Sequence, residues 1–178
     1  MATIVQYYLL TLFLINIFLF HIPLSKAGVD FIVNTCKHTQ NSGFCVAALE
    51  SDRRSFNAST VAELTGIAIE IATAAAASTL SRINDLADQD PGTAAEEALK
   101  QCAQLYGNAI DDLEEAGKDV RSGDYSGAAE PVDSAWEVPR SCEDAFADRS
   151  LSSPVAAEDK DVDVKCGLCF DLVDLLNS

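Results

Sequence analysis

The chain has 178 residues, which suits one domain preceded by a targeting segment. Its 12 basic and 28 acidic residues give a formal charge of −16, which argues against nucleic acid and anionic membrane surfaces as partners, because both are bound through Lys and Arg. A strong negative field favours a basic protein as partner, although the same charge can serve solubility alone. Only 7% of the residues are aromatic, which favours closely packed helices.

The N-terminus is typical of a secretory signal peptide. Residues 9–20 are almost entirely apolar, and Ser25-Lys26-Ala27 offers small residues at the two positions that a signal peptidase reads. We therefore expect residues 1–27 to be a signal peptide and residues 28–178 to be the mature, secreted chain. No Lys or Arg precedes the apolar run, so a retained membrane anchor is the alternative, but the uninterrupted run is short for a bilayer span.

No alternating strand pattern follows residue 28, and helical stretches succeed one another along the chain. The first two, over residues 29–35 and 44–51, are short. A turn-rich segment separates them. Residues 28–55 therefore predict a small N-terminal helical hairpin.

Residues 58–178 carry the longer helical patterns. Over residues 59–88 and 94–120, apolar side chains recur every three or four positions, as on the buried face of a helix. On the first of these helices the apolar positions include Ile71 and Ala74, and on the second they include Leu105.

A third long stretch, over residues 125–148, contains Pro131 and Pro139. An interior proline removes a backbone hydrogen bond, so we expect this helix to be bent or broken. The last helix begins near Pro154. Four long amphipathic helices joined by short links predict an all-α fold, an antiparallel four-helix bundle beside the hairpin.

Six cysteines in an exported chain predict disulfides. Cys36 and Cys45 enclose a short local loop, and Cys102 and Cys142 lie on the inward faces of adjacent predicted helices. These are the two pairs that we favour, although six cysteines allow fifteen connectivities. By reducing the entropy of the unfolded chain, a disulfide should stabilise the fold by about 2.7 kcal/mol for the short loop and by roughly 4 kcal/mol for the long one.

Cys166-Gly167-Leu168-Cys169 forms a C-x-x-C pattern, for which redox and zinc-binding roles are alternatives. No βαβ pattern accompanies it, and neither a second C-x-x-C nor a His pair completes a zinc site. Both cysteines fall on the apolar side of the last helix, so we expect free core thiols and no metal. Separately, Asn57-Ala58-Ser59 is an N-glycosylation acceptor, which predicts a glycan on Asn57.

The sequence offers no catalytic residues. It contains no phosphate-binding glycine loop and no G-x-S-x-G pattern, and the mature chain keeps one histidine, His38, without an evident nucleophile beside it. Its paired carboxylates fall on polar helix faces, where a solvated surface is the simpler interpretation. We expect a binding protein without a cofactor, and no enzyme.

Several segments resemble the plant invertase/pectin methylesterase inhibitor family. Cys36 and Cys45, with eight residues between them, match its N-terminal hairpin, and six pieces match in the family's order. The matching pieces include Cys45-x-x-x-Leu49-x-x-Asp52-x-Arg54-Ser55, Leu99-x-x-Cys102-x-x-x-Tyr106-x-x-Ala109-x-x-x-Leu113, Ser122-Gly123-Asp124-Tyr125, Ser134-Ala135 and Ser141-Cys142-Glu143-Asp144-x-Phe146.

The resemblance implies a helical hairpin on a four-helix bundle, with the first cysteine bonded to the second and the third to the fourth. Several members carry a fifth cysteine, which Cys166 resembles, while Cys169 is additional. The resemblance also implies a protein target, pectin methylesterase or invertase, in the apoplast, the cell wall or the vacuole. Pectin methylesterase inhibitors cover the substrate cleft in one-to-one complexes.

Two details of the resemblance bear on the target. Invertase inhibitors use a Pro-Lys-Phe turn, and here that turn is Asp124-Tyr125-Ser126-Gly127, which favours pectin methylesterase. The matching contact row on the second bundle helix is Gln104, Asn108 and Asp111. Inhibition of invertase is the alternative, and a secreted structural or storage protein is the alternative from another class.

Overall fold

The structure, a computed structural model, describes residues 26–89 and 91–178. The predicted signal peptide, residues 1–27, lies almost wholly outside the described residues. Within the described part every regular element is a helix, which confirms the all-α prediction. The elements are α2 (Lys26–Cys36), α3 (Ser42–Glu50), the 3-10 helix η1 (Arg53–Asn57), α4 (Val61–Ala87), α5 (Ala94–Ser122), α6 (Ala129–Ala147) and α7 (Ala156–Leu176).

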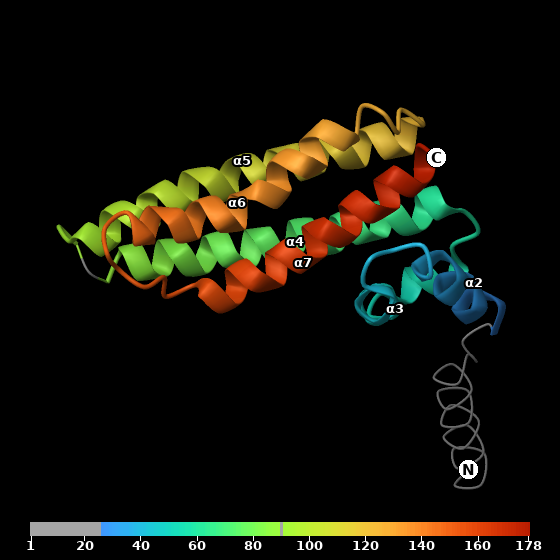
Figure 1. Ribbon diagram of the computed structural model, residues 1–178, viewed down its shortest axis with the longest axis horizontal. Coiled ribbons are helices and arrows are strands. Elements are labelled where there is room, and N and C mark those ends of the chain that lie inside the picture. Colours follow the sequence, from blue (N-terminus) through green and yellow to red (C-terminus); the bar gives the residue numbers. More distant parts are fainter. Residues whose placement is uncertain (1–25, 90) are drawn as a thin grey trace, which may run out of the picture.

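The four long helices form the predicted bundle. α4 packs against α5 and α7, and α6 packs against the same two helices, so each helix has two principal neighbours. Short turns join successive helices, which therefore run antiparallel (Figure 1). The hairpin of α2 and α3 lies with η1 at one end of the bundle, near the start of α4 (Figure 1).

Local hydrogen bonds start α4. The side chain of Thr60 accepts the backbone N–H of Glu63 at 3.2 Å, and the Glu63 carboxylate accepts the N–H of Thr60 at 3.1 Å. This reciprocal pair is a capping box, which satisfies donors that have no partner inside the helix. Hydrogen bonds from Ser59 and then Thr60 lower the pKa of Glu63.

The core is made mainly of small and aliphatic side chains. On α4 the residues that face it include Leu64, Ala72 and Ala76, all fully buried, and α5 packs along this helix. The sequence placed Ile71 and Ala74 on this face, but Ile71 is only half-buried and Ala74 is exposed. A spacing of three or four residues between apolar positions does not fix the rotation of a long helix about its own axis. Packing against the neighbouring helices decides it.

We expected a bent or broken helix here, and α6 is one continuous helix, so the broken alternative is wrong. Pro131 is its third residue, where a backbone N–H would have no helical partner to lose. Pro139 lies inside the helix and is buried in the bundle. Contacts with α5 and α7 therefore outweigh the lost hydrogen bond.

Two disulfides cross-link the fold. Cys36–Cys45 joins the end of α2 to α3 with Cα atoms 5.5 Å apart, and Cys102–Cys142 joins α5 to α6 with Cα atoms 4.8 Å apart. The first holds the hairpin together. The second ties two bundle helices whose bonded residues are 40 positions apart in the sequence.

α4 is long and apolar enough by composition to cross a membrane, alone among helices of the described ranges. Its alanine-rich sequence has a structural explanation in the bundle. Small residues allow α5 and α7 to approach it closely along its length.

Candidate functional site

The outer face of α5 carries the three residues that the family resemblance indicated for partner binding. Gln104, Asn108 and Asp111 are all exposed, while the opposite face of α5 is buried in the bundle. Steps of four and three residues place them in one row along the helix. The structure therefore brings all three to a surface that a partner can reach.

Further carboxylates join this row. Burial, followed by the charges of Glu115, Asp111 and Glu130, raises the pKa of Asp112. Glu130 belongs to the first turn of α6, so two helices build what we call the acidic face, namely Asp111, Asp112, Glu115 and Glu130. A basic partner would relieve the repulsion among these groups. The sequence did not predict that Glu130 belongs to this face, because the spacing of residues along α5 gives no information about the position of α6.

Hydrogen bonds hold the turn between α5 and α6. Gly123 ends α5 with a φ of 84°, which a residue without a Cβ adopts at little cost. The Asp124 carboxylate then accepts the N–H of Gly127 at 2.9 Å and the hydroxyl of Ser126 at 3.1 Å. The amide of Asn177 donates to the carbonyl oxygen of Tyr125 at 3.0 Å. This turn is therefore fixed both by its own side chains and by the C-terminal end of the chain.

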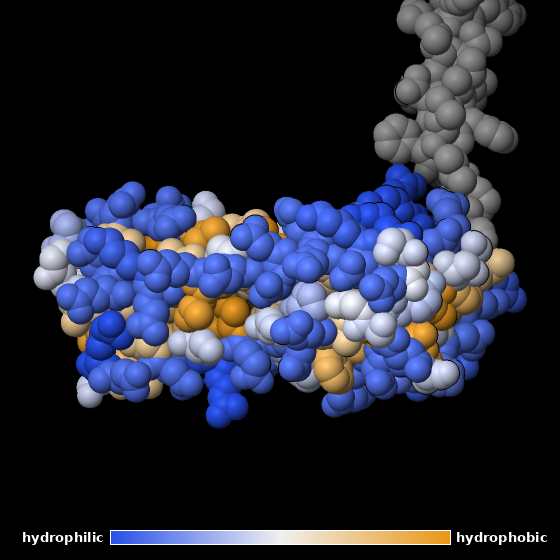
Figure 2. Space-filling view, turned by 90° about the horizontal axis from the view of Figure 1, so that it is seen from above, coloured by the Kyte–Doolittle hydropathy of each residue, from blue (hydrophilic) through white to orange (hydrophobic). Residues whose placement is uncertain are grey.

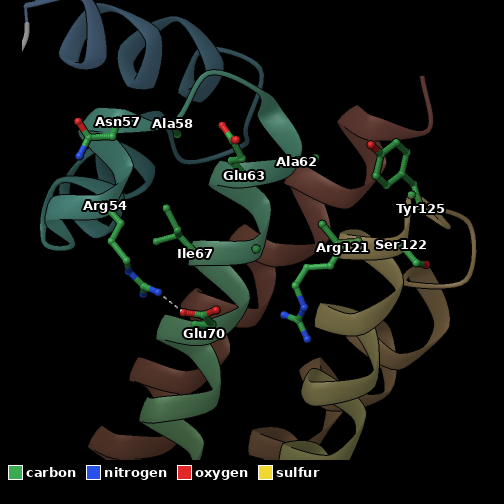
Figure 3. A pocket seen from close by; sticks show the side chains of 13 residues that line it. Arg54, Asn57, Ala58, Ala62, Glu63, Ile67, Glu70, Arg121, Ser122 and Tyr125 are labelled. Atoms are coloured by element: carbon green, nitrogen blue, oxygen red, sulfur yellow. Dashed lines mark hydrogen bonds and ion pairs between the residues drawn. The ribbon is translucent and has the colours of Figure 1, made fainter.

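A cleft of about 650 Å³ separates η1 and α4 from the end of α5. Figure 3 shows Arg54 and Glu70 joined on one side, and Arg121 and Tyr125 on the other. Arg54 pairs with Asp52 at 2.6 Å and with Glu70 at 2.5 Å, and hydrogen bonds to Asp52, then to Glu70, raise the pKa of Arg54. Both ion pairs are exposed, so they orient the wall of the cleft more than they stabilise the fold.

Asn57 lies at the rim of this cleft, at the end of η1, and is exposed. Ala58 after it has an extended backbone. An exposed asparagine in such a segment leaves room for a glycan, so glycosylation of Asn57 stays a prediction.

Cys166 and Cys169 are free and buried on α7. Burial raises the pKa of the Cys166 thiol to about 12 and raises that of Cys169 as well. A raised pKa keeps a thiol protonated, and a protonated thiol is a poor nucleophile and a poor metal ligand. Residues 26–89 and 91–178 contain no group of three or more His, Cys, Asp and Glu that could hold a metal ion.

Large apolar side chains are rarely exposed on the described part of the chain. Figure 2 shows a face on which hydrophilic residues predominate and apolar residues emerge only in patches between them. Leu151 is the one exposed large hydrophobic residue in the described part of the chain. Charge and hydrogen bonding, more than apolar area, therefore distinguish the outer faces of the bundle.

Comparison with known proteins gives a consistent result. The family profile described as "Plant invertase/pectin methylesterase inhibitor" matches residues 30–172. A pectinesterase inhibitor of Actinidia deliciosa is 33% identical over 141 residues, covering 75% of this chain and 74% of the relative. The Arabidopsis thaliana cell wall/vacuolar inhibitor of fructosidase 2 is 30% identical over 157 residues, covering 85% of this chain and 87% of the relative.

Solved structures agree with the sequence matches. The crystal structure of a mutant form of a pectin methylesterase inhibitor from Arabidopsis superimposes with a TM-score of 0.67 and 26% identity, covering 79% of this chain and 93% of that one. The helical fold of this chain is therefore similar to that of a solved pectin methylesterase inhibitor. The chain is a member of the plant invertase/pectin methylesterase inhibitor family.

Proposed function

We propose that this protein inhibits a pectin methylesterase by binding one-to-one over the substrate cleft of the enzyme. The observation that carries the proposal is the exposed row Gln104, Asn108 and Asp111 beside the acidic face, on a member of an inhibitor family. Relatives named pectinesterase inhibitors, and a solved pectin methylesterase inhibitor of the same fold, support this target. The function requires a rigid surface and no chemistry of its own.

The second candidate function is inhibition of an acid invertase. Relatives named inhibitors of invertase or fructosidase favour it. The turn between α5 and α6 counts against it, because Asp124 to Gly127 contains no Pro-Lys-Phe. A secreted structural or storage role remains the candidate from another class, and it predicts no enzyme target at all.

We also propose that residues 1–27 direct the chain to the cell exterior as a cleaved signal peptide. Two disulfides and an exposed glycosylation acceptor at Asn57 suit an oxidising secretory route. Expression in plant cells, followed by N-terminal sequencing of the extracellular protein and enzymatic removal of N-glycans, tests both points. A start near Gly28 and a mass loss on deglycosylation are expected, and a retained membrane fraction would contradict the proposal.

The inhibitory function is tested by titrating the refolded mature protein into pectin methylesterase and acid invertase assays at mildly acidic pH. We expect a one-to-one loss of pectin methylesterase activity and unchanged sucrose hydrolysis. The reverse pattern would support the second candidate, and no loss in either assay would support the structural role.

A charge-reversal pair locates the surface. Asp111→Lys places a positive charge in the row, and we expect it to weaken inhibition at least tenfold, because like charges then face a basic partner. Asp85→Lys makes the same charge change at an exposed position of α4 and should leave inhibition unchanged. Equal effects of the two substitutions would mean that net charge, and no particular face, drives binding.

A further inference from the structure

Two carboxyl groups lie beside one groove between α6 and α7, and each has a buried oxygen without a hydrogen-bond partner. Asp159 in the first turn of α7 is only 2% exposed, and its Oδ2 atom has no donor. Oε1 of Glu143, on α6, is buried and also lacks a donor. Both side chains line one groove between α6 and α7, and the Glu143 carboxyl is close enough to raise the pKa of Asp159. Two ionised carboxylates can only accept hydrogen bonds, so these two groups can bond to each other only with a proton on one of them.

The surroundings of the pair oppose a double negative charge. The other oxygen of Asp159 accepts the Tyr106 hydroxyl at 2.6 Å, which satisfies only half of the carboxylate. A groove of about 370 Å³ between α6 and α7 lies beside the pair. Arg140 and Lys160 line this groove but form no ion pair with either carboxyl group. Burial without a compensating cation favours the protonated state.

The groups that face the pair come from three helices. They are Tyr106 on α5, Arg140 on α6, and Glu158, Lys160, Asp163 and Cys166 on α7. The buried residues of α4, the remaining bundle helix, are all uncharged. Burial, followed by the Glu143 contact, raises the pKa of Asp159 to about 7, while the Tyr106 hydrogen bond acts in the opposite direction.

We propose that Glu143 and Asp159 share one proton across the contact of α6 with α7, and that this proton acts as a pH-sensitive latch on the bundle. With the proton in place, the two carboxyl groups form a hydrogen bond that ties the helices together. When the proton is lost, two neighbouring negative charges, of which the one on Asp159 is buried, repel each other and the contact weakens. The inference concerns the stability of the fold and holds for any target of the inhibitor.

The direction of the pH effect follows from proton linkage. The folded chain holds this proton up to about pH 7, whereas an unfolded Asp releases it near pH 3.8. The stabilisation is therefore fully present below pH 3.8 and is lost as the pH rises toward 7. One proton corresponds to about a tenfold rise in the unfolding equilibrium constant per pH unit within that window.

Denaturant unfolding of the disulfide-intact protein between pH 5 and about pH 8 tests the latch, in the chain as it stands and in two isosteric variants. Glu143→Gln and Asp159→Asn each supply a permanent N–H donor between the two side chains, so no shared proton is needed. We expect the roughly tenfold rise per pH unit between about pH 5 and 6.5 in the parent. Both variants should show a much flatter profile.

Asp174→Asn, an exposed change on the same helix, is the matched control and should keep the parent slope. A flat parent profile, or an identical slope in both variants, would overturn the proposal. Should a variant fail to fold, NMR of the parent labelled with ¹³C at Asp carboxyls decides. One Asp that titrates near neutral pH supports the latch, and complete ionisation of every Asp by about pH 5 refutes it.

Discussion

The hydroxyl of Tyr106 donates a 2.6 Å hydrogen bond to Oδ1 of Asp159, and both side chains are buried. The bond joins α5 to α7, which are not principal neighbours in the bundle. It therefore crosses the core between two diagonally placed helices. The bond gives the buried Tyr106 hydroxyl its acceptor and gives Oδ1 of Asp159 its donor, while Oδ2 has no donor.

Removal of this bond should destabilise the fold. Tyr106→Phe leaves a buried carboxyl group without its donor, for which we expect a loss of about 1–3 kcal/mol in the free energy of unfolding. Denaturant unfolding at mildly acidic pH measures the loss. Tyr125→Phe removes a hydroxyl at a less buried position and should change stability by less than about 0.5 kcal/mol. Equal losses in the two variants would show that the hydrogen bond to Asp159 does not stabilise the fold.

The two disulfides should differ in what they stabilise. Replacing Cys102 and Cys142 by Ala opens the longer loop and should cost about 4 kcal/mol, because the unfolded chain gains more freedom. Replacing Cys36 and Cys45 should cost about 2.7 kcal/mol. Hydrogen exchange should become faster mainly in the hairpin when Cys36–Cys45 is removed. It should become faster throughout α5 and α6 when Cys102–Cys142 is removed. A larger loss from the short loop would contradict this order.

The capping box predicts an acid-sensitive helix start. The pKa of Glu63 is lowered from 4.5 by its hydrogen bonds, so its stabilising contribution is present above pH 4.5 and lost as the pH falls through the lowered value. Glu63→Gln should therefore reduce the dependence of stability on pH below 4.5. Thermal unfolding across that range is the measurement. Glu114→Gln, exposed on α5, serves as the control and should preserve the acid dependence.

Gly28 should tolerate no side chain. A Cβ there would lie 2.1 Å from the carbonyl oxygen of Phe56, so α2 would have to move away from η1. We expect Gly28→Ala to cost about 1–3 kcal/mol and to raise hydrogen exchange in the hairpin. Gly43→Ala is the matched control on α3, where the nearest atom would be 4.0 Å away. Unchanged exchange in Gly28→Ala would show that the hairpin adapts without loss.

Much of the architecture was predictable because its causes are local. Periodic apolar residues, helix caps and turn residues lie within a few positions of one another, so the α4 and α5 boundaries differ from prediction by at most two residues. The exposed row on α5 was likewise predictable from spacing alone. Resemblance to the inhibitor family supplied the choice of that row as a binding surface.

Features that depend on contacts between residues distant in the sequence were not predicted. Periodicity offered Leu105 as a core residue, yet Tyr106 is fully buried, because Asp159 from another helix satisfies its hydroxyl. Pro139 predicted a bent or broken helix, but α6 continues through it and packs against α5 and α7. In both cases the deciding partner is distant in the chain, where local patterns carry no information.

The sequence by itself determined that this protein is helical, that its helices have one apolar face each, and which cysteines could be joined. Only the tertiary structure decided which polar groups share a surface or a buried contact. It placed Glu130 near the α5 carboxylates, and Glu143 and Asp159 beside one groove. The physical reason is that electrostatic interactions depend on distance and burial in the folded chain, and neither can be read from the order of residues along it.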